Sequence, residues 1–107
     1  MSFSIKVTGR FKKQLKRLSK KHNSLKNDFQ NFLDSLEKNP SQGKSIGNNC
    51  FKIRLAITSK GKGKSGGARI ITHIQVMESK IYLLSIYDKS EQSTITEKEI
   101  QEILNSF

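Results

Sequence analysis

The chain has 107 residues, which predicts one domain spanning 1–107 and leaves little room for a second. Hydrophobic residues make up only 34% of the chain, while 20 Lys and Arg stand against 9 Asp and Glu and give a net charge of +11. The sequence holds no apolar run as long as the ~20 residues of a membrane span, no apolar signal-peptide core and only one cysteine, Cys50, which excludes an intramolecular disulfide. We therefore expect a cytoplasmic protein with a modest core and no membrane partner.

The N-terminal part predicts one strand and two helices. Residues 3–7 alternate apolar and polar side chains as a short strand does, and Thr8 can cap the helix that follows to about His22. A second helix begins after Ser24 and ends at Asn39-Pro40, because proline disfavours helix in the residue before it. Each helix carries its apolar residues on one face, which predicts a helical hairpin. These residues are Phe11, Leu15 and Leu18 in the first helix and Leu25, Phe29, Phe32, Leu33 and Leu36 in the second.

The C-terminal part predicts three strands and a last helix. We expect a polar connection over 41–49, strands over 50–57, 68–76 and 81–87, and a glycine- and lysine-rich loop over 58–67. Thr96 and Glu99 form a capping box that opens the last helix, whose apolar stripe is Ile100, Ile103, Leu104 and Phe107. The order β-α-α-β-β-β-α predicts an α+β fold in which a helical hairpin packs on a mostly antiparallel sheet.

Alternation along the strands predicts two unlike faces of this sheet. Phe51, Ile53, Leu55 and Ile57 should face the helices, and Lys52 and Arg54 the other side. The third strand places Arg69 with Ile71, His73 and Gln75, and the fourth places Ser85, Tyr87 and Lys89 opposite Tyr82, Leu84 and Ile86. If the polar sets align, they form a basic patch with an aromatic ring beside it: Lys52, Arg54, Arg69, Tyr87 and Lys89. Such a patch suits RNA, although a solvated outer face is the alternative.

The charge distribution also points to a polyanion. Basic residues exceed acidic ones by seven within 1–40 and again within 41–80, whereas acidic residues are in excess within 81–107. This asymmetry indicates nucleic acid as a partner, with solubility alone as the other explanation. Two histidines and one cysteine, widely spaced, do not predict a zinc site.

Three runs resemble the RelE toxin superfamily, and together with the helical hairpin they cover nearly the whole chain. They are CFKIRL at 50–55, GARII at 67–71 and LSIYDKSE at 84–91. The insert KGKGKSGG at 60–67 and the YDKSE run are most similar to its HigB-like branch. The resemblance implies a RelE-like fold and the toxin of a type II toxin–antitoxin pair. The superfamily includes both ribosome-dependent mRNA endonucleases and ParE relatives that poison gyrase.

The resemblance also implies catalytic residues. Lys52 and Arg54 occupy the two basic positions of the family's first hairpin strand, Arg69 matches the basic residue of the next strand, and Lys89 matches a further basic group. The implied reaction is cleavage of mRNA by attack of a ribose 2′-OH on the neighbouring phosphorus, with no metal and no cofactor. Lys52 is then the candidate base, Arg54 and Arg69 hold the phosphate, and Lys89 is an acid or a further clamp.

The chain departs from the family at one position, since Ile95 stands where RelE has a tyrosine that stacks on the target base. Tyr87 is the candidate substitute. His73 faces the patch and is a second candidate base or RNA contact, the alternative being a hydrogen-bonded strand residue. Cys50 is expected to pack at a strand start rather than act as a nucleophile. We expect the loop lysines Lys60, Lys62 and Lys64 to contact RNA phosphates, with a solvated loop as the alternative.

The expected partners are mRNA on the ribosome and a cognate antitoxin, itself expected to be a helix-turn-helix protein. The antitoxin should cover the basic patch or displace the last helix, whose Ile100, Ile103 and Phe107 are available to pack. Two other functions stay open: a ParE-like, non-enzymatic inhibitor of gyrase, and a basic RNA-binding module without catalysis.

Overall fold

Thr8 joins the first strand to the first helix. In the computed structural model, which describes residues 3–106, β1 (Ser4–Val7) leads into α1 (Gly9–Lys21). The Thr8 hydroxyl accepts a hydrogen bond from the Phe11 amide at 3.2 Å and donates one to the Leu83 carbonyl at 2.9 Å. The predicted cap is therefore confirmed, and it also fixes the start of α1 to the sheet.

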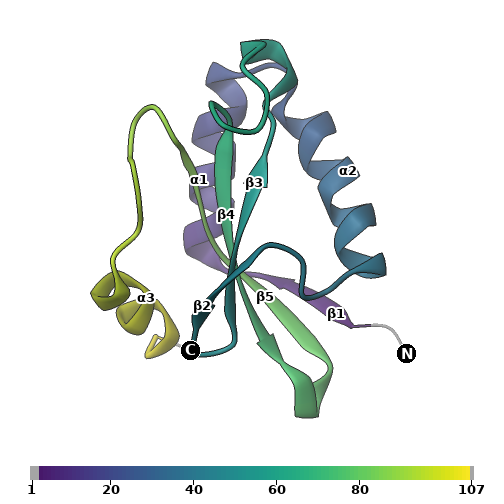
Figure 1. Cartoon of the computed structure of the whole chain (residues 1–107), viewed down its shortest axis with the longest axis vertical. Coiled ribbons are helices and arrows are strands. Elements are labelled where there is room, and N and C mark those ends of the chain that lie inside the picture. Colours follow the sequence, from purple (N-terminus) through teal and green to yellow (C-terminus); the bar gives the residue numbers. More distant parts are fainter. Residues whose placement is uncertain (1–2, 107) are drawn as a thin grey trace.

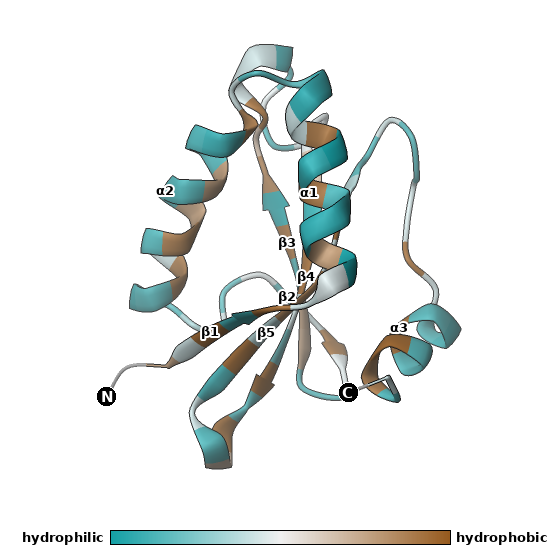
Figure 2. Cartoon of the chain, turned by 180° about the vertical axis from the view of Figure 1, so that it is seen from behind, coloured by the Kyte–Doolittle hydropathy of each residue, from teal (hydrophilic) through white to brown (hydrophobic). Residues whose placement is uncertain are grey.

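The two N-terminal helices form the expected pair on one face of the sheet (Figure 1). α2 (Leu25–Lys38) ends with Asn39 as its C-cap, directly before Pro40, as the sequence predicts. Hydrophobic positions on both helices turn toward the sheet and hydrophilic positions turn outward (Figure 2). Phe11 and Leu18 of α1 and Leu25 and Leu36 of α2 are fully buried against it.

The sheet has five strands in the order β1-β5-β4-β3-β2. β1 is parallel to β5 (Lys80–Asp88), and the other neighbours are antiparallel: β2 (Lys44–Gly47), β3 (Cys50–Leu55) and β4 (Ala68–Gln75). Short 3-10 turns at Thr58–Lys60 and Val76–Glu78 follow β3 and β4. α3 (Glu97–Leu104) begins with the predicted capping box and lies on the other face of the sheet (Figure 1). The α+β class, the helical hairpin and the mostly antiparallel sheet are confirmed.

One strand was not expected. The segment 41–49, predicted to be a plain connection, contains β2, which pairs with β3 across a two-residue turn at Asn48 and Asn49. Both asparagines have a positive φ, 54° and 59°, as the two central residues of a type I′ hairpin turn require. The order of helices and strands along the chain is therefore β-α-α-β-β-β-β-α.

The sheet separates two hydrophobic clusters. The larger lies under α1 and α2 and includes Ile53, Ile57, Ile70, Ile74, Ile81, Leu83 and Ile86, which confirms the core face predicted for 50–57. The smaller lies under α3 and consists of Cys50, Ile71, Leu84, Tyr87, Ile95, Ile100 and Ile103, with Ile46, Tyr82 and Leu104 packed against it. Ile100 and Ile103, which were expected to be available to a partner, thus pack against the chain's own sheet. Phe107 lies outside the described residues.

A register shift corrects the face predicted for part of β5. Ile71 lies opposite Ser85 but Thr72 lies opposite Leu83, so Leu84 is an extra residue in the ladder. Alternation is interrupted there, and Tyr82 and Leu84 therefore pack in the same cluster as Tyr87, not on the opposite face as predicted. Ile86 does lie on the helical-hairpin face.

Candidate nucleic-acid interface

Cross-strand pairing brings the predicted basic residues together near the C-terminal ends of β3 and β5. Arg54 lies opposite Arg69, which in turn lies opposite Tyr87, and Lys52 is two residues from Arg54 along β3. Lys89 follows β5 directly, and its amide donates to the Gly67 carbonyl at 3.0 Å. The alignment of the polar sets is thus confirmed in this part of the sheet. We call Lys52, Arg54, Lys62, Lys64 and Lys89 the basic end of the sheet.

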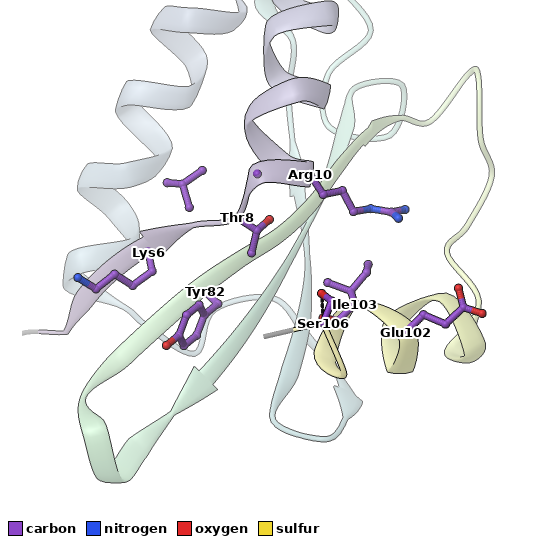
Figure 3. Close-up of a pocket in the computed structure, with 9 residues that line it drawn as sticks. Lys6, Thr8, Arg10, Tyr82, Glu102, Ile103 and Ser106 are labelled. Carbon is purple, nitrogen blue, oxygen red and sulfur yellow. Dashed lines mark hydrogen bonds between the residues drawn. The ribbon is translucent and has the colours of Figure 1, made fainter.

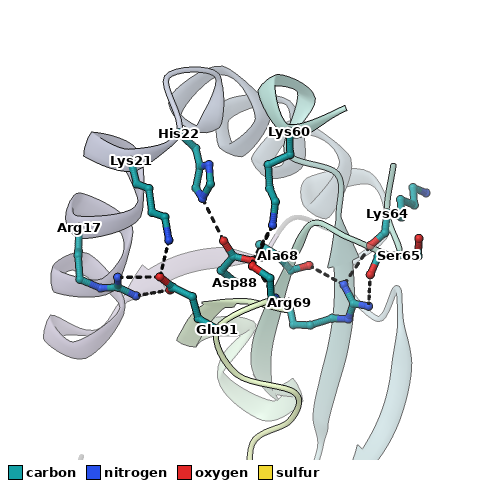
Figure 4. Close-up of polar contacts among 11 residues, drawn as sticks. Arg17, Lys21, His22, Lys60, Lys64, Ser65, Ala68, Arg69, Asp88 and Glu91 are labelled. Carbon is teal, nitrogen blue, oxygen red and sulfur yellow. Dashed lines mark hydrogen bonds and ion pairs between the residues drawn. The ribbon is translucent and has the colours of Figure 1, made fainter. Parts of the chain in front are cut away.

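Arg69 was expected to be an exposed cation, but it is buried. Its residue is only 6% exposed, and its guanidinium donates to the carbonyls of Lys64 at 3.0 Å, Ser65 at 3.3 Å and Ala68 at 3.2 Å (Figure 4). Three backbone acceptors thus engage both terminal nitrogens of the guanidinium that was predicted to hold a phosphate. Arg69 therefore fixes the glycine-rich loop, while Lys62 and Lys64 of that loop remain exposed.

Tyr87 is also buried, at 3% exposure, inside the cluster covered by α3. Burial raises the pKa of its phenol. Tyr87 was expected to stack on an RNA base. Because the protein encloses the ring, it is not available for stacking in this structure. Ile95, at the position where RelE has the stacking tyrosine, packs in the same cluster.

Lys60 differs from the other loop lysines. Its ammonium donates to Asp88 Oδ1 at 2.8 Å and to Ser90 Oγ at 3.2 Å, and its side chain is 12% exposed (Figure 4). It therefore neutralises a buried carboxylate instead of extending toward RNA as expected. The Lys60–Asp88 contact joins the turn after β3 to the end of β5.

Asp88, which directly precedes Lys89, contributes to the candidate site but was not predicted from the sequence. It is 1% exposed and accepts hydrogen bonds from Lys60, from His22 Nε2 at 3.0 Å, and from the amide and hydroxyl of Ser90 at 2.9 and 2.7 Å. Burial alone would raise the pKa of Asp88, but these hydrogen bonds outweigh burial and hold it below its ordinary value. The one signal in the sequence is an acid that ends an otherwise apolar strand.

A second ion cluster lies beside the first. Glu91 accepts from Arg17 at 2.9 Å and from Lys21 at 2.7 Å, and these two cations lower the pKa of Glu91 to about 2 (Figure 4). Together with the Asp88 contacts, they fix segment 88–91 to the C-terminal half of α1. Lys89 belongs to this segment. The contacts of Asp88 on one side and of Glu91 on the other therefore set the position of Lys89.

The three remaining catalytic candidates differ in accessibility. Arg54 and Lys89 are exposed, and the Lys89 ammonium donates to the Ser93 carbonyl at 3.2 Å. Lys52 is half-buried and lines a small cleft of about 260 Å³ with Ile46, Asn48, Thr94, Ile95, Glu97 and Ile100. The segment before α3, which contains Thr94 and Ile95, therefore covers one side of Lys52, whereas Arg54 is exposed to solvent.

His73 lies away from the basic end, opposite Cys50 on β3 and Tyr82 on β5. Its Nδ1 is 3.5 Å from Cys50 Sγ, and burial lowers the pKa of His73. Burial raises the pKa of the Cys50 thiol to about 11, so that at neutral pH the thiol stays protonated. This agrees with the expectation that Cys50 packs at a strand start.

A further cleft of about 470 Å³ lies between the β1–α1 turn and α3 (Figure 3). It is lined by Lys6, Thr8, Arg10, Tyr82, Glu102, Ile103 and Ser106, among others, none of which belongs to the basic end.

Within residues 3–106, no three His, Cys, Asp or Glu side chains are grouped as metal ligands would be. In the same part of the chain, no helix is both long and apolar enough to cross a membrane.

The fold and this surface define a small basic α+β protein, with a helical hairpin and a C-terminal helix on opposite faces of a five-stranded sheet. The chain belongs to the RelE toxin family. The family model, described as the RelE toxin of the RelE/RelB toxin–antitoxin system, matches residues 10–106.

Solved structures of E. coli RelE have the same fold. A double arginine-to-alanine mutant in the free state aligns with a TM-score of 0.66 at 14% identity, covering 100% of this chain and 99% of that one. The isolated toxin aligns with a TM-score of 0.63 at 15% identity, covering 98% and 99%. The same mutant in complex with a peptide of the antitoxin RelB aligns with a TM-score of 0.62 at 14% identity, covering 95% and 94%.

Proposed function

We propose that this RelE-family chain is the toxin of a type II toxin–antitoxin pair and cleaves mRNA on the ribosome. The observation that carries the proposal is the basic end of the sheet, where the half-buried Lys52 and the exposed Arg54 lie two residues apart on β3. The exposed Lys62 and Lys64 lie in the loop between β3 and β4, and the exposed Lys89 follows β5. Cations at one end of a sheet can hold an RNA phosphate while an amine of the same surface accepts a proton.

In this proposal Lys52 accepts the proton of the ribose 2′-OH, and the 2′ oxygen attacks the neighbouring phosphorus. Arg54 stabilises the charge on the phosphate, and Lys89 protonates the leaving 5′ oxygen or binds the next phosphate. A positioned base contributes roughly 10²–10⁴-fold and one charge-stabilising donor roughly 10²–10³-fold. Arg69 acts through the loop that it fixes, so we assign it a positioning role in place of the phosphate contact expected from the sequence.

These contributions are modest for RNA cleavage, which supports the ribosome as a second component that orients the strand. The KGKGKSGG insert supports the HigB-like branch of the superfamily. A cognate antitoxin, expected to be a helix-turn-helix protein, would neutralise the toxin by covering the basic end or by replacing α3 on the sheet. The RelE complex with an antitoxin peptide supports such a partner.

The test is induced expression followed by mapping of new RNA 5′ ends, with DNA topology measured in the same cells. We expect translation to stop and cuts to appear within translated messages. Arg54→Ala should abolish the cuts, whereas the control Lys38→Ala, which removes an exposed lysine at the end of α2, should leave them unchanged. Gyrase-linked DNA breaks with intact mRNA would instead support the ParE-like alternative.

A second candidate is RNA binding without cleavage, which the burial of Tyr87 favours because no aromatic ring of β5 is presented beside Arg54. In that case the wild-type protein would bind ribosomes and arrest growth, and the 5′-end map would not change.

A further inference from the structure

The edge of the sheet next to Arg54 is uncovered. The ladder between β2 and β3 extends no further than Lys44 opposite Lys52. Gly43, with a φ of +96°, then turns the chain away; a Cβ there would lie 2.6 Å from the Lys52 carbonyl oxygen, so only glycine fits. Within the described part of the chain, residues 53–56 consequently have no strand beside them on this edge, and a groove of about 270 Å³ separates them from α2.

Both charged and neutral polar groups line this groove. Arg54 and Lys64 line it with cationic side chains, and Asn31, Ser35 and Gln42 contribute neutral polar ones. Asp28 also lines it, and its carboxylate accepts hydrogen bonds from Ser24 and from the amide and hydroxyl of Thr58. Asn31 and Ser35 are four residues apart and so lie on one face of α2. Because Arg54 belongs to both the basic end and the groove, a strand of RNA bound at the basic end can continue into the groove.

The amide of Gln42 is held in one orientation. Ser35 Oγ donates to the Phe32 carbonyl at 2.8 Å and accepts from Gln42 Nε2 at 3.2 Å, and Nε2 also donates to the Asn39 carbonyl at 3.3 Å. Both hydrogens of the Gln42 amide are thereby engaged, which leaves Oε1 to act as an acceptor. The groove thus presents the Gln42 acceptor oxygen together with two cations, Arg54 and Lys64, and the Asp28 carboxylate, which Thr58 and Ser24 already engage.

We propose that this groove binds one nucleotide of the RNA strand and selects its base. Arg54 and Lys64 contact the phosphate, and Gln42 Oε1 accepts a hydrogen bond from an exocyclic amino group. Adenine, cytosine and guanine carry such a group, whereas uracil offers only its N3–H, which lies between two carbonyl oxygens that repel Oε1. The position of this nucleotide next to the cleaved bond rests on the proposed function; the groove's preference for amino-bearing bases does not.

Mononucleotides test the groove without any cleavage. We would titrate AMP, CMP, UMP and inorganic phosphate and follow the side-chain amide resonances of Gln42 and Asn31 by NMR. One neutral hydrogen bond predicts that AMP and CMP bind about 2–10-fold more tightly than UMP. Gln42→Met should abolish this preference. Gln30→Met, which changes an exposed glutamine elsewhere on α2, should retain it.

A second variant guards against a local folding effect of Gln42→Met. Ser35→Ala removes an exposed hydroxyl from α2 and frees the Gln42 amide to rotate, so the preference should weaken while phosphate binding persists. Equal affinity for AMP, UMP and inorganic phosphate in the wild type would overturn the proposal.

The cleavage map separates this inference from the proposed function. If mRNA is cut, uracil should be depleted at one fixed position beside the cut, and Gln42→Met should restore it; undiminished uracil at every flanking position would overturn the inference alone. If mRNA is not cut but AMP still binds more tightly than UMP, the proposed function fails and the groove assignment stands.

Discussion

Replacing Asp88 by Asn should destabilise the fold strongly at neutral pH. The carboxylate is 1% exposed and receives hydrogen bonds from Lys60 and His22, so Asp88→Asn leaves the Lys60 ammonium in a nearly buried site without its anion. Breaking a buried ion pair from one side typically costs about 3–5 kcal/mol. Because the Lys60 side chain retains 12% exposure and can partly regain water, we expect the lower end, about 3 kcal/mol. That loss corresponds to a fall in Tm of roughly 12–24 °C for a domain of this size.

The pH dependence gives the same prediction a second readout. The pKa of Asp88 is depressed in the folded state, so its stabilising contribution is present above the unfolded value of about 3.9 and is lost as the pH falls toward the folded value. The difference in unfolding free energy between wild type and Asp88→Asn should therefore be about 1 kcal/mol smaller at pH 3 than at pH 7.

Urea denaturation at both pH values measures this difference, with Asp34→Asn, an exposed site on α2, as the control. A difference under about 0.5 kcal/mol at pH 7, the range of ordinary surface substitutions, would refute the reasoning.

Arg69→Ala should lower the unfolding free energy by about 2 kcal/mol or more, since charged hydrogen bonds contribute about 1.5–3 kcal/mol each, and should speed proteolysis within 61–67; an unchanged melting curve would contradict the positioning role. Arg54→Ala, at an exposed site, should stay within about 0.5 kcal/mol of wild type and lose toxicity. Ile53→Ala should cost about 2–5 kcal/mol and keep its activity per folded molecule, which a melting curve and a cleavage assay on the same sample would check. Affinity for single-stranded RNA should fall with salt by about 0.7 log units per log unit for each phosphate contacted; a salt-independent affinity would count against the basic end.

Local patterns predicted most of the fold. Thr8 and Thr96 cap helices where expected, Pro40 follows the end of α2, and the alternation of 50–57 identified the core face of β3. β2 was missed because four residues with a single apolar side chain, Ile46, give no usable alternation. The Asn48-Asn49 pair, with its tolerance of positive φ, was the signal that could have found the hairpin.

The candidate site was harder to predict because side-chain partners distant in sequence determine which cations are free. Alternation placed Arg69 on the correct face, but it could not show that the loop carbonyls of Lys64 and Ser65 take its donors. Likewise Lys60 appears in the sequence as one of three equivalent loop lysines, and only the fold brings Asp88 to it. Tyr87 was predicted to be exposed because the apolar stripe of the last helix did not show which surface it would cover, and α3 packs on that half of the sheet.

The most direct test of the account is cleavage in a purified translation system with one defined mRNA. Wild-type protein should cut the message only when ribosomes translate it. Lys52→Ala and Arg54→Ala should each reduce the cutting rate by roughly 10²-fold or more while their melting temperatures stay near that of wild type. Lys38→Ala should cut at the wild-type rate. If the wild-type protein leaves the translated message intact, or if both variants stay folded and cut it as fast as wild type, the basic end of the sheet is not the active site of an mRNA endonuclease.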